Sequence, residues 1–140
     1  MGTEVLRQIV TADIPVNAIT QPRLYAKAVV ALGAIGAGYT PTAAQILQSS
    51  IFACSPAALG TFTLPTAALL VAGLAQPQVG TFFEFTIVSL DANNITVTLG
   101  VGITLTGIPA TFIVNNVSEH YIGYFTNVTA GAEAATVVRA

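Results

Sequence analysis

A chain of 140 residues fits one domain with a single hydrophobic core, and 54% of its residues are hydrophobic. Only 7% of the residues are charged, where an ordinary soluble domain carries about 25%. The net charge of −2 excludes the strong positive field that attracts nucleic acid, so nucleic acid is not an expected partner. Because uncharged polar residues supply most of the polarity and lose little inside an interface, the composition favours an assembling subunit over a free monomer.

The few charges are unevenly spread along the chain. Three of the four basic residues lie in the first 27 positions, and residues 28–83 carry no charge. We expect this uncharged stretch to be the part most heavily buried between subunits. Its purest apolar run, residues 67–75, is about half the ~18–20 residues that a membrane-spanning helix needs. No apolar segment typical of a signal peptide follows Met1, so we expect neither a membrane span nor a signal peptide.

The chain begins with residues 1–22, which carry two prolines and show no hydrophobic period. This pattern predicts an extended N-terminal arm that packs along a neighbouring subunit or locally. Residues 23–140 are expected to form one β-sandwich domain. Alternating polarity predicts its first strand at 23–29, and three glycines within 33–38 predict a loop after it.

The sequence Pro-Thr-Ala-Ala occurs twice, at 41–44 and at 65–68. In the first copy we expect a short helix up to Leu47, with Thr40 as the N-cap and Pro41 at the first helical position. The second copy predicts a helix of the same kind. Strands are expected between the two copies, at 50–54 and 60–64.

From residue 80 onward the hydrophobic pattern has a period of two. Phe83, Phe85 and Ile87 fall on one face of a strand, and Glu84 and Thr86 fall on the other. Short strands recur, and turn residues punctuate them. The turn residues are at 91–94, 100–102, 115–116, 123 and 129–131. The strands are predicted at 81–88, 95–99, 103–106, 110–114, 121–128 and 135–139. This spacing predicts a mainly β protein, an antiparallel and jelly-roll-like β-sandwich with one or two short helices, in which the strands after Gly80 are self-sufficient.

The candidate residues for chemistry are few. His120 is the only histidine, and in a strand its neighbours Glu119 and Tyr121 point to the opposite face, so no pair of base and nucleophile is expected. Cys54 lies in an apolar run and is expected to be buried and inert. The carboxylates that would have to converge for glycosidase or metal chemistry are scattered: Glu84, Asp91, Glu119 and Glu133. We therefore expect a protein that is not an enzyme, with no catalytic residue, no cofactor and no metal site.

Other ligands have weak support. The one basic–aromatic cluster, Arg23-Tyr25-Lys27, offers at most weak contact with nucleic acid. Three tyrosines offer rings that could stack on a sugar, with core or interface positions as the alternative: Tyr39, Tyr121 and Tyr124. Three asparagines begin glycosylation sequons, and their turn positions explain them without a glycan: Asn94, Asn116 and Asn127.

Several segments of residues 40–140 together resemble a recurrent β-rich structural module of virion proteins in phages and large DNA viruses. They are Pro41–Leu47, Leu64–Ala68, Val79–Val88, Ile95–Leu99, Val101–Gly107 and Thr126–Val137. The resemblance implies a capsid decoration protein, a minor capsid protein or part of a fibre. One departure stands out, because the chain has His120–Phe125 where such modules usually carry an Arg-rich strand.

These observations predict a virion structural protein on the capsid surface or in a fibre. We expect a homo-oligomer, with a trimer among the options, that also contacts other capsid or fibre proteins. One alternative is a non-viral extracellular filament subunit assembled by strand donation, with residues 1–22 completing a neighbour's sheet. Another is a tip module that binds a carbohydrate or a receptor.

Overall fold

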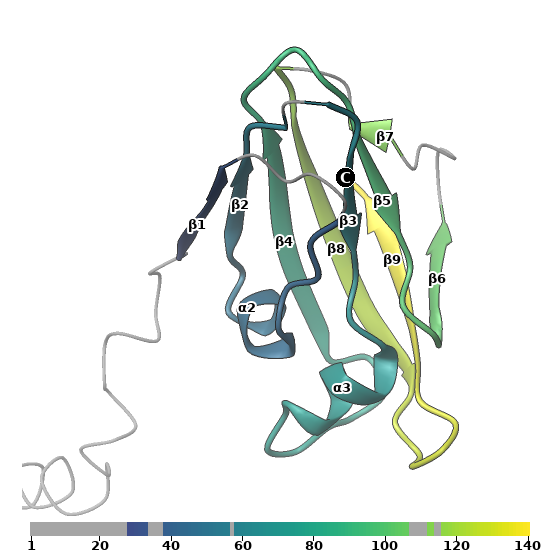
Figure 1. Cartoon of the computed structure of the whole chain (residues 1–140). Helices are drawn as coiled ribbons and strands as arrows, with labels where there is room; N and C mark the ends of the chain where they lie inside the picture. Colours follow the sequence, from purple (N-terminus) through teal and green to yellow (C-terminus); the bar gives the residue numbers. More distant parts are fainter. Residues whose placement is uncertain (1–27, 34–37, 57, 107–111, 114–115) are drawn as a thin grey trace, which may run out of the picture.

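The computed structural model describes residues 28–33, 38–56, 58–106, 112–113 and 116–140 (Figure 1). Within these ranges the protein is mainly β, as predicted, with two short helices. The elements in chain order are β1 (Val29–Gly33), α2 (Ala43–Leu47), β2 (Ile51–Cys54), β3 (Gly60–Thr63), α3 (Ala67–Ala72), β4 (Phe82–Ser89), β5 (Ile95–Thr98), β6 (Ile103–Thr106), β7 (Phe112–Ile113), β8 (Ser118–Asn127) and β9 (Ala134–Arg139). The predicted arm at 1–22 and most of the predicted strand at 23–29 lie outside the described residues.

The strands form two sheets that enclose a common core. Sheet A has six strands in the order β1-β2-β4-β8-β9-β6, and sheet B has three in the order β3-β5-β7. In Figure 1, β3 and β5 lie in front of sheet A, with α2 and α3 at the lower end. Both halves of the chain supply strands to both sheets. The prediction that the strands after Gly80 form a self-sufficient unit is therefore wrong.

The strand pairing is mixed, so the predicted antiparallel arrangement is wrong for part of the fold. Parallel pairs are β1–β2, β2–β4, β3–β5 and β6–β9, whereas β4–β8, β5–β7 and β8–β9 are antiparallel. Parallel neighbours need long crossover connections, and here α2 lies between β1 and β2, while β3 and α3 lie between β2 and β4. The jelly-roll order is not confirmed.

Both Pro-Thr-Ala-Ala segments start helices, but the predicted N-cap at Thr40 is wrong. The cap is Thr42, whose Oγ1 accepts the backbone N–H of Gln45 at 3.2 Å. The Gln45 side chain in turn accepts the backbone N–H of Thr42 at 2.8 Å, which completes a capping box. Thr40 has Ala43 three residues ahead and cannot form this reciprocal pair. In the second copy, Thr66 occupies the same position.

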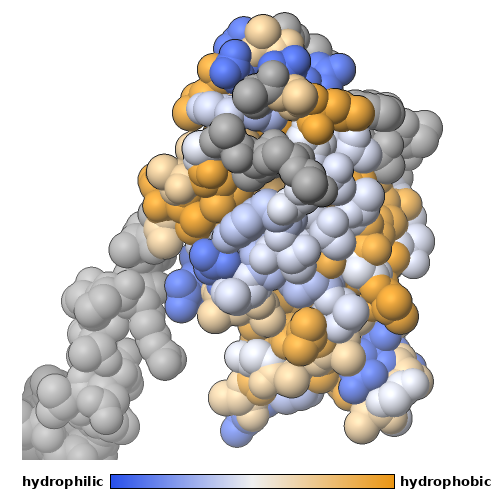
Figure 2. Space-filling model, in the orientation of Figure 1, coloured by the Kyte–Doolittle hydropathy of each residue, from blue (hydrophilic) through white to orange (hydrophobic). Residues whose placement is uncertain are grey.

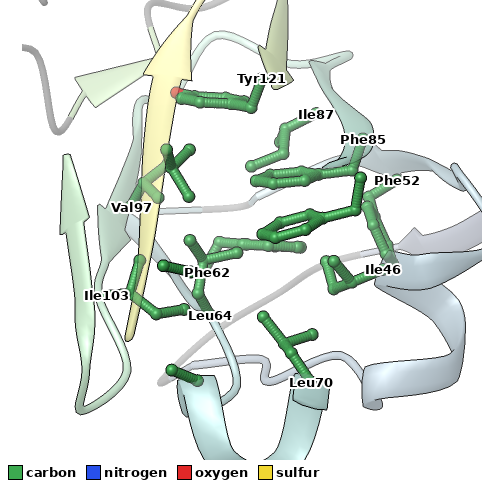
Figure 3. Close-up of a cluster of buried hydrophobic side chains, with 14 of the residues drawn as sticks. Ile46, Phe52, Phe62, Leu64, Leu70, Phe85, Ile87, Val97, Ile103 and Tyr121 are labelled. Atoms are coloured by element: carbon green, nitrogen blue, oxygen red, sulfur yellow. The ribbon is translucent and has the colours of Figure 1, made fainter. Parts of the chain in front are cut away.

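The core between the sheets is built on stacked aromatic rings (Figure 3). The rings of Tyr121 and Phe85 on sheet A stack with their centroids 5.0 Å apart. Phe62 of sheet B stacks on Phe85 at 6.5 Å and meets Phe52 edge-on at 5.0 Å, so these contacts join the two sheets. Buried aliphatic side chains from the two helices also join this core: Ile46, Leu70 and Val71.

The uncharged stretch 28–83 supplies half of the buried core residues. Burial inside this one chain therefore accounts for much of its lack of charge. The expectation that it is buried between subunits stays a prediction, and it applies to those residues of the stretch that point away from the core.

The sequence predicts that Gly123 separates two strands, but this residue lies in the middle of β8. It pairs directly with Phe83 of β4. A Cβ atom at position 123 would lie 2.2 Å from Cζ of Phe83, so the phenyl ring occupies the space that a side chain would need. Such packing of an aromatic ring over a glycine is one way in which neighbouring strands fix their register.

We predict that Gly123→Ala lowers the free energy of unfolding by about 1–3 kcal/mol, because the new methyl group must displace the Phe83 ring. Chemical denaturation measures this change. In a Phe83→Leu background the same substitution should cost clearly less. Equal costs in the two backgrounds would show that the ring is not the obstacle.

A second prediction concerns the helix cap. Thr42→Ala should lower the free energy of unfolding by about 1 kcal/mol, because it removes the acceptor for the Gln45 N–H. Thr42→Ser should retain most of the stability. The exposed Thr40 provides the matched control, and Thr40→Ala should change stability by less than about 0.5 kcal/mol. A larger loss at Thr40 than at Thr42 would argue against this cap assignment.

Candidate assembly surface

The side of sheet A that faces away from sheet B mixes apolar side chains with polar ones, mainly threonines, and no described helix or strand lies over it. We call this surface the open face. Its side chains come from alternate positions of the strands, so they are the partners of the core residues in the period-two pattern. The central strands β2, β4, β8 and β9 contribute Ile51, Ala53, Phe82, Glu84, Thr86, Val88, Ser118, His120, Ile122, Tyr124, Thr136 and Val138. The edge strand β1 adds Val29 and Ala31, and the edge strand β6 adds Thr104 and Thr106.

Large apolar side chains stand next to one another on the open face. Phe82 lies directly opposite Tyr124 in the register of β4 and β8, and Ile122 lies opposite Val138 in that of β8 and β9. Phe82 is 72% exposed, Tyr124 41% and Ile122 39%. Isolated exposed apolar residues are ordinary on protein surfaces, but contiguous ones mark places where a partner binds.

A polar cluster lies at the centre of the open face, on the two middle strands. Nε2 of His120 lies 3.4 Å from Oε2 of Glu84, and Nδ1 of His120 lies 3.1 Å from Oγ1 of Thr86. Both ring nitrogens therefore have a partner within the chain. The side chains of His120 and Glu84 are 33% and 30% exposed, so both are partly accessible to solvent.

The order hydroxyl, imidazole, carboxylate resembles the arrangement used for nucleophilic catalysis, so its surroundings matter. Thr86 and His120 pair with each other in the middle of interior strands, whose backbone N–H groups are used by the sheet ladder. Within these two described strands, no pair of free N–H groups is thus at hand to bind an oxyanion beside Thr86. This cluster is not predictable from the sequence, because Thr86 and His120 are 34 positions apart in the chain.

Glu119 points to the other side of sheet A, as predicted from its alternation with His120. It is 6% exposed, and the guanidinium of Arg139 donates two hydrogen bonds to its carboxylate. Tyr121, the next residue on this side, belongs to the core. Burial raises the pKa of Tyr121 to about 12, with the charge of Glu119 acting in the same direction and Arg139 opposing it.

The outer face of sheet B differs from the open face, because threonines cover it. Thr61 pairs with Thr96 and Thr63 with Thr98 in the parallel register of β3 and β5. The hydroxyls of Thr63 and Thr98 are hydrogen-bonded at 2.6 Å. Figure 2 views the molecule from this side and shows a pale, weakly polar surface over β3 and β5 with hydrophobic patches around it. One side of the molecule is thus lined with hydroxyls, whereas the opposite side exposes the large apolar residues Phe82, Ile122 and Tyr124 among its polar ones.

The predicted burial of Cys54 is confirmed, since the residue is fully buried, and burial raises the pKa of its thiol to about 11. The carboxylates are spread over the fold as predicted, with Glu84 on the open face and Glu119 beside Arg139. Asp91 and Glu133 lie in the connections after β4 and β8. Among the residues that the structure describes, no three His, Cys, Asp or Glu side chains are grouped so that they could hold a metal ion.

The three tyrosines do not share a surface. Tyr121 lies in the core, Tyr39 packs against the rings of Phe52 and Phe62, and Tyr124 lies on the open face. The basic cluster of residues 23–27 lies outside the described ranges.

The sequon asparagines occupy turns or strand ends, as predicted. Asn94 lies in the connection between β4 and β5. Asn116 has a positive φ of 56°. Asn127 accepts the backbone N–H of Thr129 at 2.9 Å.

None of the helices in the described ranges has the length and apolar character needed to cross a membrane. Comparison with known proteins gives no match to a family model, to a curated protein or to a solved structure. The resemblance to virion modules therefore stays a prediction.

The ion pair between Glu119 and Arg139, on the core side of sheet A, gives a testable prediction. Arg139→Met leaves the Glu119 carboxylate buried without its cation and should lower the free energy of unfolding by about 3 kcal/mol. The double variant Glu119→Leu/Arg139→Met should recover most of that loss, because no buried charge remains. Denaturant unfolding of the two variants checks this. If the single variant were as stable as the double one, the carboxylate would not depend on Arg139.

Proposed function

We propose that this chain is a non-catalytic structural subunit that forms oligomers, and that the assembly is a virion. In that assembly it would act as a capsid decoration, minor capsid or fibre subunit. The observation that carries the proposal is the open face, where the neighbouring side chains of Phe82, Tyr124 and Ile122 are exposed to solvent. Covering apolar surface gains about 25 cal/mol per Å², so this face favours association.

Composition supports the same function. With 7% charged residues, charge repulsion keeps copies of this chain apart only weakly. The threonine-lined face of sheet B, in contrast, hydrogen-bonds to water without needing a partner. A subunit with one hydroxyl-rich side and one side that exposes large apolar residues suits a shell or a fibre, in which one side is covered and the other faces solvent.

The viral part of the proposal is supported by the sequence resemblance of residues 40–140 alone. It names the class of assembly, whereas the open face supports assembly as such. The two parts are therefore tested separately.

A second candidate function is a filament joined by strand donation, and the observation favouring it is strand β1. This strand lies at the end of the order in sheet A, and none of its residues is fully buried. The outer edge of such a strand can pair with a strand from another chain. Electron microscopy discriminates the candidates, since filaments that disappear on deletion of residues 1–22 would favour strand donation.

The virion proposal predicts that the chain travels with virus particles. Gold-labelled antibodies raised against the purified chain should bind the outside of particles enriched from the source material. The chain should also sediment with those particles through a density gradient. Labelling confined to material without particles would contradict the viral assignment and leave the assembly function to be judged on its own.

A further inference from the structure

We propose that the partner covering the open face is a second copy of this chain. The two copies pack with their open faces together about a two-fold axis that passes beside Glu84 and His120. This inference rests on the proposed function, because it names the partner and the surface used for assembly.

The size of the open face fits such a dimer. Six strands spaced by ~4.8 Å, with about seven residues rising ~3.3 Å each, span roughly 600 Å² in projection. A stable interface buries about 800 Å² of accessible surface per partner. The accessible surface of a face is larger than its flat projection, so one open face provides about the area that a stable dimer needs. The open faces of two copies match in size because the copies are identical.

The centre of the open face is self-complementary in charge. β4 and β8 are the middle strands of sheet A, and they carry Glu84 and His120, the only acidic residue and the only histidine among the described residues of this face. About a two-fold axis a residue meets either itself or its reciprocal partner. Facing two Glu84 carboxylates would be repulsive, whereas Glu84 of each copy facing His120 of the other sets each carboxylate against an imidazole instead of a second carboxylate. Charge complementarity thus selects a second copy and places the axis.

Covering this centre does not leave the imidazole without a partner. His120 is already bonded to Thr86 and contacts Glu84 within the same chain. Because these polar groups keep their partners within the chain, covering them with a second copy carries a smaller desolvation penalty. Around the centre, Phe82, Tyr124 and Ile122 provide the large side chains that typically contribute most to a protein interface.

Analytical ultracentrifugation of the full chain tests the surface. The wild type should sediment as a dimer of the 14.3 kDa chain. Ile122→Lys should weaken self-association at least about 10-fold, because it places an ammonium group inside the interface. The matched control is Val101→Lys, since Val101 is the most exposed large apolar side chain of the described residues at 83% and lies between β5 and β6, away from the open face. The Val101→Lys variant should associate as strongly as the wild type.

A charge exchange tests the two-fold arrangement. Glu84→Lys alone and His120→Glu alone should each dimerise poorly. The first replaces the carboxylate that faces the imidazole with an ammonium group, and the second brings two carboxylates together across the axis. An equimolar mixture of the two variants should form heterodimers. In the mixed pair, the lysine introduced in one copy faces the glutamate introduced in the other, and the native contact between Glu84 and His120 is retained on the second side of the axis. Circular dichroism of each variant checks that the fold is retained.

The outcomes separate this inference from the proposed function. If Ile122→Lys and the wild type associate equally, the open face is not the interface, although an assembling subunit remains supported. If the mixture of charge variants stays monomeric while the wild type dimerises, the axis is wrong. A wild type that stays monomeric at ~1 mM overturns the dimer. Particle labelling then decides the virion proposal independently.

Discussion

The antiparallel pairing of β4 with β8 is the constraint on which both faces of sheet A depend. Inside, it places the Phe83 ring over Gly123, where no side chain fits. Outside, the same register sets Phe82 opposite Tyr124 and Thr86 opposite His120. A slip by one residue would turn the core side chains of β4 toward solvent. The close contact of Phe83 with Gly123 therefore fixes the register that keeps the core side chains inside and sets which residues form the open face.

This constraint explains how a chain with few charges organises its surfaces. Glu119 and Arg139 neutralise each other beside the core, and Glu84 contacts His120 on the open face. The outer side of sheet B relies on threonine hydroxyls instead of charge. Solvation of the free chain thus falls mainly to sheet B and the connections. The open face is left as the surface that gains most when another copy covers it.

Much of the local structure is predictable from the sequence, and the reason is periodicity. Alternation in residues 82–88 assigns each side chain of β4 to its face, and Pro-Thr-Ala-Ala locates both helices. Strand direction is not predictable, because parallel and antiparallel neighbours produce the same alternation. The sequence predicts a turn at Gly123 because the role of this glycine depends on Phe83, which is opposite in space but distant in sequence. The contact of His120 with Thr86 is missed for the same reason.

The central claim is that a second copy covers the open face. Hydroxyl-radical footprinting across a concentration series tests it most directly, because it reads side-chain exposure in the unmodified full chain. We predict that oxidation of Phe82 and Tyr124 falls as the protein concentration rises, while oxidation of Val101 and Leu69, exposed outside the open face, stays constant. Oxidation of Phe82 and Tyr124 that is independent of concentration while the protein associates would contradict the account.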